Sequence, residues 1–221
     1  MLDKTSYEKL VDDLGHALLV AVSKRQELTK LQQLYDYGHR DYGENRVQAL
    51  TERYDALPSD IRWHLIGQLQ RNKVKYIAEW IHLIHSVDSW RLLREVDKQA
   101  AKHGRVIDFL FQIKISQEDS KSGYDLSQLR ADLAEHDLSQ LTHVRCRGLM
   151  GMASFTQDQQ LIRSEYQRLV DAMQELREGA LSACNACTEL SMGMSGDYPI
   201  AVEMGSTMVR IGSGVFGQRS Y

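Results

Sequence analysis

The sequence contains few residues that cross-link a fold or break its helices and strands: it has three cysteines and two prolines among 221 residues. Three cysteines cannot form a disulfide framework, so we expect the fold to depend on a buried apolar core, which a chain of this length can supply. Pro58 and Pro199 both fall between predicted elements, so neither breaks a helix or a strand.

The sequence also lacks a long apolar run and an excess of positive charge. No run approaches the roughly 20 apolar residues that span a bilayer. Residues 1–14 contain several carboxylates and lack the basic flank and apolar centre of a signal peptide. The formal net charge of −3 gives no basic field for nucleic acid or for an anionic membrane. We therefore expect a cytoplasmic globular protein that binds neither.

Two of the cysteines, Cys184 and Cys187, have the spacing of some metal and redox motifs. A zinc site would need a second pair of ligands at similar spacing, and the sequence shows none. We interpret the two cysteines as small residues in a turn between a helix and a strand.

What the sequence does contain is an alternation of short apolar runs with longer amphipathic segments. Continuous apolar runs are typical of parallel strands covered on both faces. Apolar residues recur at helical spacing in 90–101 and in 157–177, with Asp88 or Ser89 as an N-cap of the first segment and Gly179 as a stop for the second. The expected strands are 17–22, 38–42 (the weakest pattern), 63–66, 81–87, 106–115, 144–150, 188–192 and 208–211.

Eight strands that alternate with helices form either a closed barrel or an open doubly wound sheet. The open sheet predicts a glycine-rich turn after the first strand, but here that strand runs into Ser23-Lys24-Arg25 without a glycine. The glycines gather near the last strand instead, where barrels place phosphate sites. The sequence predicts an α/β protein that is one (β/α)8 TIM barrel over residues 1–221.

Lys24 stands at the carboxyl end of the first predicted strand, the face on which barrels build their sites. A lysine that loses solvation there can act through its neutral amine as a nucleophile toward an aldehyde. The position alone is weak support, because most lysines at strand ends are simply solvated.

A second candidate lies around the last strand, in residues 203–214. Ser206 and Thr207 follow a glycine, and Gly212 and Ser213 form a second glycine–serine turn. Backbone N–H groups and hydroxyls in such turns suit a phosphate dianion, although serines in loops usually serve turns and caps. Closure of a barrel makes the first and eighth strands neighbours, so Lys24 and these turns would face one opening.

Arg210 lies on the last strand between the two turns. If its side chain points into the opening, its guanidinium could meet a pyridine nitrogen and keep that nitrogen unprotonated, because arginine does not readily give up a proton. A surface ion pair is the alternative, and residue alternation does not decide between the two.

The motifs together resemble one family, the pyridoxal phosphate homeostasis proteins, whose barrel is similar to the N-terminal domain of alanine racemase. They occur in a single order over almost the whole chain. The matching segments are 19–24, 42–48, 63–67 with 69–70 and 72–73, 84–88, 120–123, 147–150, 190–195 and 205–212 with 216–217.

This resemblance implies that the chain binds pyridoxal 5'-phosphate (PLP), fold type III, through a Schiff base on Lys24. It implies a phosphate site, a ring-nitrogen contact and three further neighbours of the cofactor. The residues concerned are Ser206, Thr207, Gly212 and Ser213 for the phosphate, Arg210 for the nitrogen, and Asn45, His64 and the Ser191-Met192 backbone beside the ring.

Three details of the resemblance concern loops. Lys121 matches a mobile loop motif of the family, although a solvated lysine is an equal interpretation. The chain has Arg25-Gln26-Glu27 where the family usually has a proline soon after the lysine. The segment before the first strand is also shorter than usual, which predicts an abbreviated first helix.

The resemblance implies a carrier that buffers or delivers PLP in vitamin B6 homeostasis, with PLP-dependent apoenzymes as possible recipients. A PLP-dependent amino-acid racemase of low activity is the alternative. Racemases with this barrel bring a second base on a separate β-domain, for which a chain of 221 residues leaves no room. A phosphate-sugar enzyme or an interaction module on the same barrel is a third class. We expect a monomer.

Overall fold

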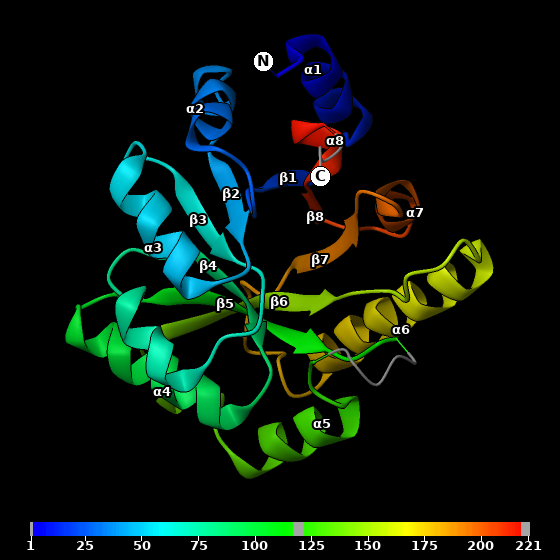
Figure 1. Ribbon diagram of the computed structural model, residues 1–221. Helices are drawn as coiled ribbons and strands as arrows, with labels where there is room; N and C mark the ends of the chain where they lie inside the picture. Colours follow the sequence, from blue (N-terminus) through cyan, green and yellow to red (C-terminus); the bar gives the residue numbers. More distant parts are fainter. Residues whose placement is uncertain (1, 117–121, 218–221) are drawn as a thin grey trace.

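The computed structural model describes residues 2–116 and 122–217, and in these ranges the chain forms a closed barrel of parallel strands in the order β1 to β8 (Figure 1). This confirms the predicted fold class. The strands are β1 Leu18–Val22, β2 Asp41–Glu44, β3 Arg62–Leu65, β4 Leu83–Val87, β5 Ile107–Ile113, β6 Val144–Gly151, β7 Glu189–Met194 and β8 Met208–Ile211.

Helices connect successive strands and surround the barrel (Figure 1). The α-helices are α1 Lys4–Asp13, α2 Leu28–Asp36, α3 Val47–Ala56, α4 Trp90–Lys102, α5 Leu126–Glu135, α6 Gln159–Glu178, α7 Tyr198–Glu203 and α8 Ser213–Phe216, and the 3-10 helices are η1 Arg71–Tyr76 and η2 Leu138–Gln140. The N-terminal α1 packs against α8 at the other end of the chain, which brings the two ends together outside β1 and β8 (Figure 1).

The two helices with the clearest sequence pattern begin and end within two residues of their predicted bounds. The Ser89 hydroxyl caps α4 by accepting the backbone N–H of Leu92, and the Asp158 carboxylate caps α6 in the same way. The apolar stripe of α6 is buried against the barrel, and Gly179 is its C-terminal cap residue. Burial of these stripes, rather than intrinsic propensity alone, holds the helices on the sheet.

Closure of the barrel depends on the pairing of β1 with β8. Val20 is in register with Arg210, and Ala21 with Ile211. Both strands are parallel, so the residues that follow them, Lys24 and Gly212, come to the same end of the barrel. The predicted neighbourhood of these two segments is confirmed.

The second strand differs from its prediction. The expected segment was 38–42, whereas β2 runs from Asp41 to Glu44. Gly38 has a φ of 96°, a left-handed conformation that reverses the chain after α2 and excludes it from the strand. The strand thus ends two residues later than predicted. The two added residues, Gly43 and Glu44, are both buried, although glycine and glutamate are uncommon in strands.

The turn after Lys24 also has a special backbone. Arg25 has a φ of 61°, and the N–H of Gln26 donates to the Ser23 carbonyl at 3.0 Å. This tight turn replaces the proline that the resemblance led us to expect nearby.

The cysteines lie where the sequence predicted them. Cys184 and Cys187 belong to the turns between α6 and β7, and all three thiols are free. Cys187 Sγ lies 3.9 Å from Cys146 Sγ on β6, a proximity that the sequence did not indicate. Within residues 2–116 and 122–217, no helix combines the length and the apolar character needed to cross a membrane.

Candidate functional site

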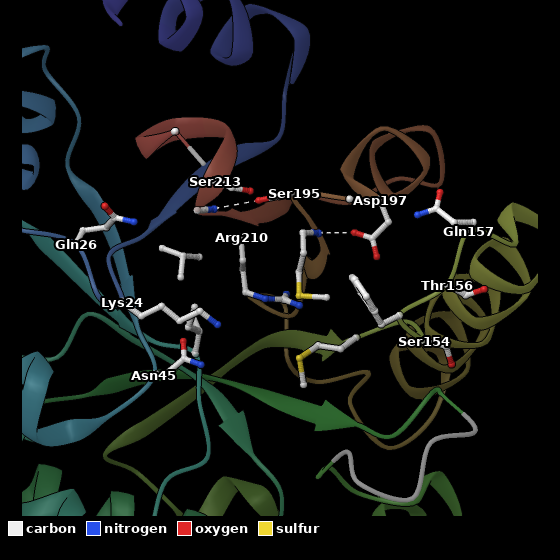
Figure 2. Close-up of a pocket in the computed structure, with 18 residues that line it drawn as sticks. Lys24, Gln26, Asn45, Ser154, Thr156, Gln157, Ser195, Asp197, Arg210 and Ser213 are labelled. Carbon is white, nitrogen blue, oxygen red and sulfur yellow. Dashed lines mark hydrogen bonds between the residues drawn. The ribbon is translucent and has the colours of Figure 1, made fainter. Parts of the chain in front are cut away.

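A cavity of about 370 Å³ opens at the carboxyl ends of the strands (Figure 2). It is lined by the segments that follow β1, β2, β3, β6, β7 and β8, so distant parts of the sequence contribute to one site. Its volume is in the range of small-molecule pockets. Of the ten residues proposed from the sequence, five line it: Lys24, Asn45, Arg210, Gly212 and Ser213.

Lys24 enters the cavity from the end of β1. Its side chain is half-buried and runs across the cavity, with its amine directed toward the Asn45 amide and the Arg210 guanidinium (Figure 2). The preceding Ser23 is fully buried, and its hydroxyl lies within hydrogen-bond distance of two acceptors, the Gly43 carbonyl at 3.1 Å and Glu44 Oε2 at 3.0 Å. The root of the lysine is therefore fixed to β2, while its end reaches the cavity.

Glu44 joins the two walls that carry Lys24 and Asn45. Its buried carboxylate accepts the Ser23 hydroxyl, accepts the Asn45 backbone N–H at 2.8 Å and pairs with Arg53 Nε at 3.0 Å. A buried carboxylate with three partners of this kind is a rigid junction. The sequence alone does not indicate this role of Glu44, because one acidic residue at a strand end resembles an ordinary solvated side chain.

Asn45 lines the cavity and carries an unsatisfied buried atom. Among the described residues, its Oδ1 is buried and has no hydrogen-bond partner. A buried amide oxygen without a donor costs free energy, so this position suits a ligand that brings a hydroxyl.

Arg210 forms part of the cavity floor and is 4% exposed. Its Nη1 donates to the Ser191 carbonyl at 2.7 Å and to the Ser191 hydroxyl at 2.6 Å, and its Nη2 donates to the Gly151 carbonyl at 3.0 Å. Burial lowers the pKa of Arg210, but the guanidinium still remains charged at neutral pH. The alternative of a surface ion pair is thereby excluded.

The turn after β8 meets the turn after β7. The Gly212 backbone N–H donates to the Ser195 hydroxyl at 3.3 Å, and Ser213 lies beside them on the rim (Figure 2). Two hydroxyls and a backbone N–H thus converge at one side of the cavity, opposite Lys24 and Asn45. This donor set suits a phosphate group.

Asp197 lies at the far wall and is already engaged. Its Oδ1 accepts the Met194 backbone N–H at 2.6 Å, and its Oδ2 accepts the Tyr166 hydroxyl at 2.9 Å. Burial, followed by the charge of Asp197, raises the pKa of Tyr166 above its usual range. Tyr166 therefore stays protonated and keeps the carboxylate in place.

Ser206 and Thr207, which the sequence suggested for the phosphate, do not line the cavity. They precede β8, whereas the cavity lies beyond its other end. The Ser206 hydroxyl is buried and lies within hydrogen-bond distance of the Met192 and Met208 carbonyls, and Thr207 Oγ1 donates to Glu189 and accepts the Leu190 N–H. The structure does not bring this pair to the cavity, whereas Ser195, which follows β7, lines it.

Three other proposed residues lie beneath the cavity. Ser191 is fully buried and contacts Arg210 from below, and the Met192 carbonyl accepts the Ser206 hydroxyl. His64 is fully buried in the barrel interior, where it contacts His85 and Asp41. None of the three lines the cavity. Lys121 lies outside the described residues.

Ser195 was within reach of sequence reasoning. It follows an apolar strand and stands beside Gly196 in a turn, which is the pattern that singled out Ser213. Barrels build their sites at the carboxyl ends of strands, and Ser195 follows β7 just as Lys24 follows β1 and Ser213 follows β8.

Fold and cavity together define a (β/α)8 barrel whose carboxyl face holds an amine, a guanidinium and a small hydroxyl-lined cradle. The family pattern of the alanine racemase N-terminal domain matches residues 6–220 of this chain. The chain is 38% identical over 207 residues to the pyridoxal phosphate homeostasis protein of Aquifex aeolicus, covering 93% of this chain and 88% of that protein. It is 33% identical over 210 residues to the protein of the same name from Escherichia coli, covering 92% and 86%.

Among solved structures, PipY of Synechococcus elongatus without PLP superimposes with a TM-score of 0.90 at 36% identity, covering 97% of this chain and 99% of that one. PipY with PLP bound gives a TM-score of 0.86 with the same coverage. Alanine racemase of Bartonella henselae shares the fold alone, with a TM-score of 0.70 at 15% identity, covering 99% of this chain and 61% of that one. The chain belongs to the pyridoxal phosphate homeostasis protein family.

Proposed function

We propose that this protein binds PLP and serves as a carrier that buffers or delivers the cofactor. The observation that supports this most is the convergence of the Lys24 amine, the orphaned Asn45 Oδ1, the Arg210 guanidinium and the Ser195–Gly212 turn on one cavity. The names of the relatives point to the same cofactor.

The donor set fits the groups that PLP carries. Lys24 would condense with the aldehyde, with loss of water, and Asn45 Oδ1 would accept the ring hydroxyl. Ser195, Ser213 and the Gly212 N–H would donate to the phosphate. Arg210 would face the ring nitrogen as a donor and would keep it unprotonated, which weakens the ring as an electron sink. The cofactor itself supplies aldehyde chemistry and a route to stabilised carbanions.

The same cavity argues against a dedicated racemase. A two-base racemase needs a proton-transfer group on each face of the substrate. Among the described residues that line the cavity, the ionisable side chains are Lys24, Asp197 and Arg210. Arg210 cannot act as a base, and both oxygens of Asp197 accept hydrogen bonds from the protein. A racemase of low activity is the second candidate function, and Asp197 is the one group that favours it.

Absorbance of the PLP-loaded protein tests the proposal. We expect a visible band that is lost in Lys24→Ala while the circular dichroism of the barrel is retained. Mixing the loaded protein with a PLP-dependent apoenzyme should restore that enzyme's activity. A visible band in Lys24→Ala, or amino-acid racemisation at ordinary enzyme rates, would contradict the carrier proposal.

A cytoplasmic location, a monomeric state and apoenzymes as recipients remain predictions of this proposal.

A further inference from the structure

A line of polar side chains crosses the barrel interior beneath the cavity. Arg210 Nη1 lies 2.6 Å from Ser191 Oγ, and Ser191 Oγ lies 2.9 Å from His85 Nδ1. His85 Nε2 lies 2.9 Å from His64 Nδ1, and His64 Nε2 lies 3.1 Å from Asp41 Oδ1. Apolar side chains usually fill the interior of such a barrel, so a continuous polar line from its carboxyl face to its amino face needs a physical account.

The two ends of the line differ in kind. Arg210 can only donate hydrogen bonds. Asp41, at the start of β2, is 3% exposed and is clamped by both Nε and Nη2 of Arg62. Burial raises the pKa of Asp41, but hydrogen bonds from His64 and Arg62 outweigh burial and bring the pKa below its usual range. Asp41 is therefore an ionised acceptor at neutral pH.

The acceptor end determines the direction of every bond between. Because Asp41 can only accept, His64 Nε2 carries a hydrogen. A neutral imidazole has one donor and one acceptor, so His64 Nδ1 accepts from His85 Nε2, and His85 Nδ1 accepts from the Ser191 hydroxyl. The lone pairs of Ser191 Oγ then receive the Arg210 N–H. Burial is the largest cause that lowers the pKa of His85 well below its usual value, and this agrees with a neutral ring.

We propose that Asp41 is a positioning residue for Arg210, acting through His64, His85 and Ser191. In this hydrogen-bond chain every residue donates toward the next, from Arg210 to Asp41, and both histidines are held as the Nε2–H tautomer. A fixed Ser191 hydroxyl then orients the guanidinium in the cavity floor. The effect on PLP affinity rests on the proposed function, whereas the direction of the hydrogen-bond chain does not.

A metal at the amino face is the competing interpretation of the same residues. One ligand atom each from Asp41, His64 and His82 lies within 4.8 Å of the others. Arg62, however, donates to both oxygens of Asp41. A cation there would have to displace the guanidinium, so we interpret Asp41 as the ion-paired end of the chain.

Nitrogen NMR of the apoprotein tests the direction without any cofactor. Long-range ¹H–¹⁵N spectra of histidine-labelled protein distinguish the two neutral tautomers from the imidazolium. We expect His64 and His85 both to be protonated at Nε2 and bare at Nδ1 near neutral pH. An unprotonated Nε2 on either ring, or a doubly protonated His64, overturns the proposed direction of the hydrogen bonds.

Two matched variants test the positioning role. Asp41→Asn removes the charged acceptor, so we expect the Nδ1–H tautomer of His64 to appear. PLP affinity should fall by about twofold to thirtyfold, the range of coupling through such networks. Asp108→Asn is the control. Asp108 on β5 also pairs with arginines near the amino end of the barrel, but it takes no part in the hydrogen-bond chain. It should change neither quantity.

Ser191→Ala covers the case in which Asp41→Asn does not fold. It should weaken PLP binding by a similar factor and leave the tautomer of His64 unchanged, because Asp41 still sets that tautomer. PLP affinities equal to wild type in Ser191→Ala, or equal in Asp41→Asn and Asp108→Asn, overturn the positioning role. If the wild-type protein binds no PLP, the proposed function fails, and the histidine spectra still decide the direction of the chain.

Discussion

At the residue scale, the hydroxyl groups that we propose as phosphate donors differ from the others in the partners that they already have. Ser206 and Thr207 are occupied by carbonyls and by Glu189 at the amino end of β8. Ser195 and Ser213 are exposed on the rim, and Ser195 contacts the Gly212 N–H. The sequence favours the first pair, because a glycine followed by two hydroxyls resembles a phosphate turn. Only the register of the strand shows that the two pairs lie at opposite ends.

This difference gives a prediction about PLP affinity. Ser195→Ala should remove a hydrogen bond to a charged group, which contributes about 1.5–3 kcal/mol, so PLP affinity should fall by about tenfold or more. Ser206→Ala should leave PLP affinity within about twofold, because its hydroxyl lies outside the cavity, and should instead lower the unfolding free energy by about 1 kcal/mol. Equilibrium dialysis and urea unfolding of both variants measure these effects. Equal losses of PLP affinity in the two variants would contradict the proposed phosphate site at Ser195, Gly212 and Ser213.

At the element scale, the ends of β1 and β2 form the rigid side of the site. Continuous apolar runs predicted most strands correctly, because burial on both faces dictates their composition. The bounds of β2 were predicted wrongly because its buried residues include Asp41, Gly43 and Glu44, whose burial depends on partners from other elements. Arg53 on α3, 27 residues beyond Gln26, donates to the Gln26 carbonyl after β1 and pairs with Glu44, a contact that periodicity cannot reveal.

Glu44→Gln tests this junction. Breaking a buried ion pair leaves Arg53 without its charge partner, so we expect a loss of about 3–5 kcal/mol in the unfolding free energy. Asn45 and Lys24 should also lose their fixed spacing, and PLP affinity should decrease. The control is Glu175→Gln, which breaks the exposed pair with Arg130 and should have a much smaller effect. Chemical denaturation of both variants measures the difference, and equal losses would contradict a structural role for Glu44.

At the scale of the whole molecule, the barrel divides into a carboxyl face that holds the cavity and an amino face that holds ion pairs. The closed topology, and with it the neighbourhood of Lys24 and the last strand, followed from counting strands. The polar line through the interior could not be predicted from the sequence, because His64, His85 and Ser191 come from three separate strands and each has an ordinary sequence context. Their meaning depends on three-dimensional contact.

Buried neutral histidines make the stability of the barrel depend on pH. Burial lowers the pKa of His85, and likewise lowers that of His39, so the unfolded chain binds more protons than the folded one below about pH 6.5. Stability from these groups is thus complete above about pH 6.5 and is lost as the pH falls, by up to about 1.4 kcal/mol per pH unit for each group. Urea unfolding at a series of pH values should show this decline. His85→Gln should make it shallower, and an unchanged slope would contradict a neutral buried His85.

The most direct measurement of the central claim is the site of covalent attachment. The PLP-loaded protein is reduced with borohydride, digested and mapped by mass spectrometry. We predict that the phosphopyridoxyl group is found on Lys24 in the wild-type protein and is absent from Lys24→Ala. A label on another lysine, or no label in a protein that retains PLP, would contradict the account.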